Sequence, residues 1–265
     1  MSTGSRRSDA REEATLYVIP GSHACRAAML MLEHKQVPYR LVTFPAGMHP
    51  MLVRAFGFAA GDEARNVDGR RPAMLATINR LGTVPALRMG RERVQTNLAI
   101  ARHLERVRAE PPLFPAEPEL RAGVEEAASW GDQVLQMAAR RITFSAALEG
   151  GLDRLADRGN SGRLGPLLSR SELLRVFVTQ GAGRAVFGAA GAEDRLMAEL
   201  GEMLDAVDAW IERGVLGGEQ LNAADFLIAP SLALLAYRLD LRQGIEARPL
   251  GALIERVLPE PTAAV

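Results

Sequence analysis

Apolar positions in the first part of the chain switch between strand-like and helix-like spacing. Residues 16–19 form a short β-type run that ends at Pro20-Gly21. Residues 22–35 follow with alanines and Met31 on one helical face, and residues 39–44 form a second β-type run. A strand, a helix and a strand in this order predict a β-α-β unit, whose crossover makes the two strands parallel.

The spacing predicts two further short strands and another helix. Residues 49–56 indicate a short helical segment, and residues 84–87 lead through a hairpin turn into a returning strand at Val94. Residues 96–106 have a helical period. Residues 57–78 have no stable period and predict an insertion loop. Residues 15–108 are therefore expected to form an α/β domain, preceded by a flexible tail at residues 1–14.

A proline-rich linker separates this α/β domain from a helical one. Three prolines between residues 111 and 115 break any helix and mark a boundary. Helical spacing then dominates residues 119–258, with helices predicted at 120–148, 171–177 and 194–211.

A capping box predicts the start of one more helix in this second domain. Asn222 can accept a hydrogen bond from the N3 amide, while the Asp225 carboxylate reaches back to the N-cap amide. Residues 227–235 are apolar nearly all round, so this helix is expected to be buried.

Composition and charge narrow the class of protein. The formal net charge of the 265 residues is zero, which removes the electrostatic argument for nucleic acid or an anionic membrane as partner. No apolar run approaches the roughly 20 residues of a membrane span, and the polar N-terminus has no signal-peptide core. We therefore expect a cytoplasmic protein. The single cysteine excludes an internal disulfide, and the four histidines lack metal-ligand spacing.

The turn between the first strand and the first helix is the leading candidate site. A helix N-terminus presents free N–H groups and the positive end of the helix dipole, and it can hold an anion such as a thiolate. Ser22 is at the N-cap position, where its hydroxyl either caps the helix or donates to a thiolate. Cys25 lies in the first helical turn, where its own pKa can be lowered, although a cysteine among alanines also fits a small core residue.

Several motifs resemble those of the glutathione transferase family, theta-like and serine-type. The run Ser22-His23-Ala24-Cys25-Arg26-Ala27 is similar to the S-x-P-C-R-A start of the family's first helix. Val84-Pro85-Ala86-Leu87 matches the V-P-A-L signature, and Leu113-Phe114-Pro115 resembles the linker between the family's domains. The resemblance implies a thioredoxin-like α/β domain followed by an all-α domain.

The resemblance also implies an activity and a set of site residues. The protein would transfer glutathione or a related low-molecular-weight thiol to a small apolar electrophile, in a detoxification role and as a homodimer. Ser22 would stabilise the thiolate, with Cys25 and Tyr17 as alternatives. The thiol-binding residues implied are His49, Thr83, Val84, Pro85, Gln95 and Thr96.

Each of these residues has an implied role in holding a tripeptide thiol. A cis bond before Pro85 would expose the N–H and C=O of Val84 to the peptide as an added strand. Gln95 and Thr96 would hold the γ-glutamyl end, and His49 would donate to the glycyl carboxylate. The electrophile is expected between the domains, beside residues 130–144. The candidates there are Gln133, Met137, Arg140 and Arg141.

Departures from the family pattern keep other hypotheses open. Ala24 replaces the motif's proline, Thr83 stands where a lysine is frequent, and Gln95 lacks the usual acidic charge. Together with the insertion at residues 57–78, they motivate a non-catalytic member that uses the fold for binding or assembly. A third hypothesis is thiol–disulfide exchange that depends on Cys25.

Overall fold

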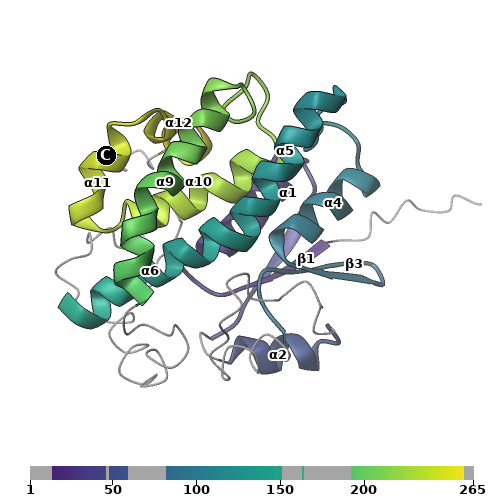
Figure 1. Cartoon of the computed structure of the whole chain (residues 1–265). Coiled ribbons are helices and arrows are strands. Elements are labelled where there is room, and N and C mark those ends of the chain that lie inside the picture. Colours follow the sequence, from purple (N-terminus) through teal and green to yellow (C-terminus); the bar gives the residue numbers. More distant parts are fainter. Residues whose placement is uncertain (1–13, 46–47, 59–81, 151–162, 164–191, 260–265) are drawn as a thin grey trace, which may run out of the picture.

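The computed structural model describes residues 14–45, 48–58, 82–150, 163 and 192–259 (Figure 1). A small sheet with its helices forms one part, and a set of longer helices forms the other (Figure 1). The predicted tail up to residue 13, residues 59–78 of the predicted insertion and the predicted helix at 171–177 lie outside the described residues. None of the helices in the described ranges has the length and apolar character of a membrane span.

The predicted β-α-β unit is confirmed. Strand β1 (Ala14–Val18) pairs in parallel with β2 (Tyr39–Thr43), and helix α1 (His23–His34) connects them. Ser22 has extended backbone and its hydroxyl accepts a hydrogen bond from the Cys25 N–H at 3.2 Å, so Ser22 is the N-cap of α1. The helix buries the predicted small-residue face, which consists of Ala24, Ala27, Ala28 and Met31.

A hairpin and two helices complete the first part of the chain. Strands β3 (Ala86–Met89) and β4 (Glu92–Gln95) are antiparallel and extend the sheet to the order β2-β1-β3-β4. Helix α2 (His49–Ala55) follows β2, and helix α4 (Asn97–Val107) follows β4. These elements agree with the predicted order of strands and helices.

The sheet register brings three loops to the same end of the sheet. Tyr17 near the end of β1 pairs with Ala86 at the start of β3, and Ala86 pairs with Gln95 at the end of β4. Because β1 ends, β3 begins and β4 ends in this one row, the segments that carry Ser22, Val84 and Thr96 all leave the sheet at that end.

A long helical run opens the second part of the chain. Helix α5 (Pro118–Trp130) continues through the π-helical turn η1 (Gly131–Leu135) into α6 (Gln136–Gly150). The sequence predicted one regular helix over residues 120–148. The structure differs because the Gln136 N–H bonds to the Gly131 carbonyl, five residues back.

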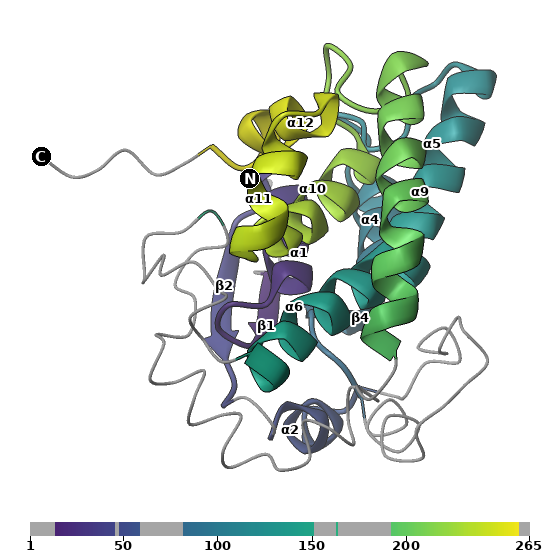
Figure 2. The same cartoon turned by 60° about the vertical axis from the view of Figure 1, so that its left-hand side comes forward.

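Of the remaining helices in the described ranges, α10 (Ala223–Leu235) is central and buried (Figure 2). The others are α9 (Ala192–Glu212), α11 (Leu239–Glu246) and α12 (Pro249–Val257). Every residue of α10 is buried, and the helix contacts α1, α5, α6 and α12. The prediction of a buried helix is confirmed, whereas α11 and α12 were not predicted from the spacing of apolar residues.

The predicted capping box is present at the start of α10. The Asn222 side chain accepts from the N–H groups of Ala224 and Asp225, and the Asp225 carboxylate accepts from the Asn222 N–H at 2.8 Å. Asp225 also accepts from the Gly217 N–H at 2.8 Å. Burial raises the pKa of Asp225 to about 6, although both amides favour the charged form. The box therefore also fixes the loop between α9 and α10.

A buried ion pair joins α1, α4 and the linker that follows α4. Lys35, the only lysine of the chain, is fully buried and pairs with the Glu105 carboxylate. The Lys35 Nζ also donates to the carbonyls of Arg108 and Ala109, at 2.7 and 3.0 Å. Glu105 accepts in turn from the Leu113 N–H at 2.9 Å. These contacts attach the proline-rich linker to the first part of the chain.

Candidate functional site

The Ser22 hydroxyl has a capping role and keeps the capacity to donate. It accepts from the Cys25 N–H, which uses one lone pair of its oxygen. A hydroxyl has one O–H donor and two acceptor lone pairs, so its hydrogen can be donated to the Cys25 thiol or to an anion at the N-terminus of α1. The capping and thiolate-binding interpretations of Ser22 are therefore chemically compatible.

Cys25 is a protonated core residue in this structure. Its side chain is 3% exposed, and burial raises the pKa of the thiol to about 11. The thiol also forms hydrogen bonds with the Ser22 side chain and the Ile19 backbone. These bonds and the charge of Arg140 lower the pKa of the thiol, but burial outweighs them. Of the two alternatives for Cys25, the structure supports the small core residue, because desolvation outweighs any effect of the helix N-terminus on the pKa of the thiol.

Tyr17 belongs to an aromatic cluster under the sheet end. Its ring lies 5.5 Å from that of Phe44, 5.1 Å from that of Phe56 and 5.5 Å from that of Phe58. The residue is 2% exposed. This packing identifies Tyr17 as a core residue.

The turn before β3 has the expected cis bond between Val84 and Pro85. Pairing with β1 and β4 ends at Ala86, so the Val84 backbone lies just beyond the sheet ladder. The Thr83 N–H donates to the Gln95 Oε1 at 3.0 Å. This bond fastens the Gln95 side chain to the turn that carries Val84.

Gly82 lets this turn approach α2 closely. Its φ is +130°, and a Cβ at this position would lie 3.0 Å from the Val53 Cγ1. Only glycine combines that conformation with so close a neighbour.

Thr96 has strained backbone at the start of α4. Its φ of 69° and ψ of 148° lie outside the regions that a β-branched residue normally occupies. The hydroxyl accepts from the Ala99 N–H at 3.3 Å, which confirms the expected N-cap. Strain of this kind costs of order 1–3 kcal/mol and is concentrated at functional sites.

Two histidines face helix α6 from the first part of the chain. His23 is buried, and its Nε2 donates to the Gln136 carbonyl at 3.2 Å. Burial lowers the pKa of His23 to about 3, and the charge of Arg140 lowers it further. His49 is the first residue of α2; burial lowers its pKa to about 4, again with a contribution from Arg140. Nothing in the local sequence marked His23 as the link between the two parts.

The four candidates on the α5–α6 run differ in exposure. Gln133 is exposed, Met137 is partly buried, and Arg141 is buried. Arg140 is half-buried and acts electrostatically on His23, Cys25 and His49. Arg140 is therefore the candidate that the structure brings near the Ser22 turn.

Acidification is expected to destabilise the protein through His23. Its pKa is about 3 in the folded state and returns to about 6.5 on unfolding. Between these values the unfolded chain binds a proton that the folded chain does not. The free energy of unfolding therefore falls as the pH drops from 6.5 toward 3, by at most about 1.4 kcal/mol per pH unit.

Denaturant unfolding of the wild type and of His23→Gln at a series of pH values measures this contribution. Glutamine can still donate to the Gln136 carbonyl but does not titrate. The free energy of unfolding of the wild type minus that of His23→Gln should fall as the pH falls. His49 titrates in both proteins, so its contribution cancels in this difference. A difference that stays constant over this range contradicts the prediction.

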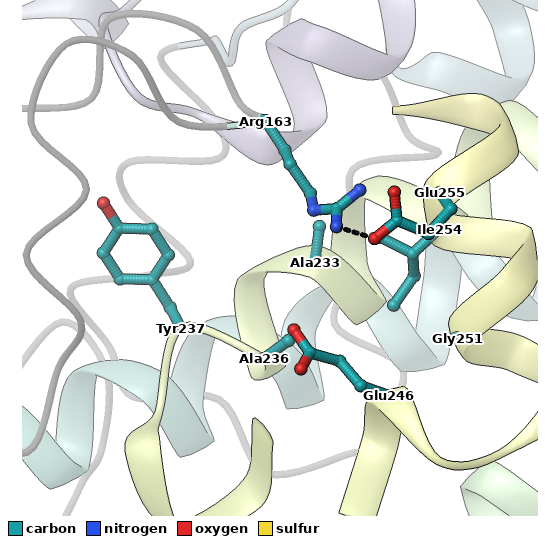
Figure 3. Close-up of a pocket in the computed structure, with 8 residues that line it drawn as sticks. All are labelled: Arg163, Ala233, Ala236, Tyr237, Glu246, Gly251, Ile254 and Glu255. Carbon is teal, nitrogen blue, oxygen red and sulfur yellow. Dashed lines mark hydrogen bonds and ion pairs between the residues drawn. The ribbon is translucent and has the colours of Figure 1, made fainter. Parts of the chain in front are cut away.

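A separate pocket lies in the helical part of the molecule (Figure 3). It is lined by Arg163 and by residues of α10, of the turn after α10, and of α11 and α12. Arg163 pairs with Glu255 and donates to the Leu258 carbonyl at 2.7 Å. None of the residues implied for thiol binding lines this pocket.

Within the ranges given above, His, Cys, Asp and Glu side chains form no group of three or more that suits a metal ion.

Comparison with known proteins identifies the fold. Residues 16–112 match the family model of the glutathione S-transferase N-terminal domain. None of the curated proteins matches the sequence. A GST-like protein from Pseudomonas syringae has 20% identity and a TM-score of 0.57, with 93% of this chain and 67% of that chain covered.

Two further structures agree with this assignment. A glutathione transferase from Pseudomonas putida, with one glutathione disulfide bound per subunit, has 15% identity and a TM-score of 0.58 over 95% of this chain and 87% of that chain. A glutathione transferase from Populus trichocarpa has 14% identity and a TM-score of 0.56, with 94% of each chain covered. The chain thus has the glutathione transferase fold, and residues 16–112 match the N-terminal domain of glutathione S-transferases.

Proposed function

We propose that this protein is a thiol transferase that joins glutathione, or a closely related thiol, to a small apolar electrophile. The observation that carries the proposal is the row Tyr17–Ala86–Gln95 in the sheet. Because of this row, three groups lie at one end of the same sheet. They are the Ser22 hydroxyl at the N-terminus of α1, the Val84 backbone before β3, and Thr96 at the N-terminus of α4. A peptide thiol needs these three kinds of contact together.

Each contact has a distinct chemical task in the proposed reaction. The Val84 backbone beyond the ladder pairs with the peptide as an added strand. Thr96 and the N-terminus of α4 hold the γ-glutamyl carboxylate, with Gln95 beside them. His49 donates to the glycyl carboxylate from the start of α2.

Ser22 supplies the activation step. The free thiol has a pKa near 8.5, so roughly two pK units must be removed for it to ionise at neutral pH. The Ser22 O–H and the N-terminus of α1 stabilise the thiolate, and the thiol proton passes to water. The sulfur electron pair then forms a bond to the electrophilic carbon, and the leaving group departs with the pair of the bond that breaks.

Calorimetric titration with glutathione and with other low-molecular-weight thiols tests this proposal. We expect saturable heat with at least one of them, together with a rise in the unfolding temperature. No heat with any thiol would remove the basis of the proposal. Binding without turnover of any electrophile would support a binding or assembly role for the same fold.

A further inference from the structure

Arg140 places a positive charge beside the Ser22 turn. It lies one helical turn after Gln136, whose carbonyl accepts from His23, so both residues face the start of α1. Figure 2 shows α6 running beside the loop between β1 and α1. Among the described residues, no side chain or backbone group forms a hydrogen bond or ion pair with Arg140.

Among the residues that the structure describes, the groups on which Arg140 acts carry no negative charge at neutral pH. We call Arg140, His23, Cys25 and His49 the Arg140 cluster. Burial holds both imidazoles and the thiol in their neutral forms at neutral pH. The next residue, Arg141, carries the same charge as Arg140 and lowers the pKa of its guanidinium, as does burial. An arginine still remains protonated under these conditions.

One other polar group in the cluster lacks a partner. The Nδ1 of His49 is buried and has no hydrogen bond. A buried polar atom without a partner and a partly desolvated cation without an anion both cost folding free energy. The unpaired charge of Arg140 indicates a position that an anion fills when the protein works, whereas His49 is the donor assigned above to the glycyl carboxylate.

We propose that Arg140 is a second catalytic residue, which stabilises the thiolate of the bound thiol together with Ser22. This inference rests on the proposed function, because the thiolate is the anion which that reaction creates at the start of α1. The Ser22 hydroxyl is bonded to the Cys25 N–H, and Cys25 is one of the groups on which Arg140 acts. The hydroxyl and the guanidinium therefore both act on Cys25, from the two different parts of the molecule.

The physical effect is a lower pKa of the bound thiol. An opposite charge within about 4–6 Å lowers the pKa of an acid by about 1–3 units. Arg140 keeps the electron pair on sulfur after the thiol proton has left to water, and the pair then forms the sulfur–carbon bond. In a nitroaryl halide acceptor the halide leaves with the carbon–halogen pair.

The test compares pH–rate profiles of the wild type, Arg140→Gln and Arg140→Lys with glutathione and a nitroaryl halide. We expect Arg140→Gln to raise the apparent pKa of the bound thiol by about one unit or more, so that kcat falls about tenfold below that pKa and recovers above it. Arg140→Lys should retain most of the effect because it keeps the charge. Arg195→Gln removes an exposed arginine from α9, which pairs with Glu199 at 3.9 Å, and serves as the matched control.

The outcomes separate this inference from the proposed function. If the wild type binds no thiol, the proposed function fails and the inference fails with it. If Ser22→Ala shifts the profile and Arg140→Gln does not, the function stands and the role of Arg140 is refuted. If Arg140→Gln weakens glutathione binding without moving the pKa, Arg140 binds a carboxylate, and this also refutes the role.

Thermal unfolding gives a readout that does not depend on activity. Because the Arg140 guanidinium has no partner among the described residues, Arg140→Met should keep or raise the unfolding temperature. A large drop for this variant would assign Arg140 a structural role and contradict the inference.

Discussion

Ser22→Ala is expected to lower kcat about 10²-fold or more, the usual loss when one charge-stabilising donor is removed. The hydroxyl is the donor that we assign to the thiolate, and alanine has none. Steady-state kinetics with glutathione and a nitroaryl halide measure the change. The KM for glutathione should change little, because the backbone of Val84 and the N-terminus of α4 still bind the peptide.

The same substitution also removes the N-cap of α1, so stability needs its own controls. Alanine at an N-cap costs about 1 kcal/mol, whereas glycine costs only a few tenths relative to serine. Ser22→Gly should therefore lose as much activity as Ser22→Ala while it remains more stable. Ser22→Thr keeps both the cap and the hydroxyl and should retain activity. Equal activity of all three variants would contradict a catalytic hydroxyl.

Glu105→Gln is expected to destabilise the protein by about 3–5 kcal/mol, since it leaves the Lys35 ammonium buried without its carboxylate. Denaturant unfolding at neutral pH measures the loss. The glutamine carbonyl can still accept from the Leu113 N–H, so the change reports mainly on the charge.

A double variant separates the charge from the shape of this site. Lys35→Met combined with Glu105→Gln removes both charges and should recover much of the stability lost by Glu105→Gln alone. Glu125→Gln breaks the exposed pair between Arg121 and Glu125 and should change the free energy of unfolding by less than about 1 kcal/mol. If Glu105→Gln changes the free energy of unfolding by no more than Glu125→Gln does, the ion pair of Lys35 and Glu105 does not stabilise the attachment of the linker.

Features that depend on residues close in sequence were predictable. The capping box of Asn222 and Asp225 and the N-caps at Ser22 and Thr96 each involve groups within three residues of one another. The buried face of α1 was also predictable, because the spacing of its alanines along the sequence determines which side chains share a face of the helix. The strands are short β-type runs bounded by turn residues, and their order then limits the topology.

Features that depend on distant residues were not predictable. The contact of Lys35 with Glu105 spans 70 positions, and that of His23 with Gln136 spans 113. The sequence left the pKa of Cys25 open, because it shows the helix N-terminus but not how completely the folded chain covers the thiol. The positive φ of Thr96, between the end of β4 and the start of α4, likewise has no signal in the sequence, because a β-branched residue rarely adopts it.

The π-helical turn at Gly131–Leu135 acts as a one-residue insertion in the run from α5 to α6, because the Gln136 N–H bonds five residues back instead of four. Each residue of a regular α-helix turns the chain by about 100°, so an extra residue in regular α-helical geometry would rotate α6 by that angle. The wider π-turn holds the extra residue within nearly the same rotation. Deletion of one residue from η1 is therefore expected to give a regular helix in which the Gln136 carbonyl still faces His23 and the flanking helices still bury the same faces.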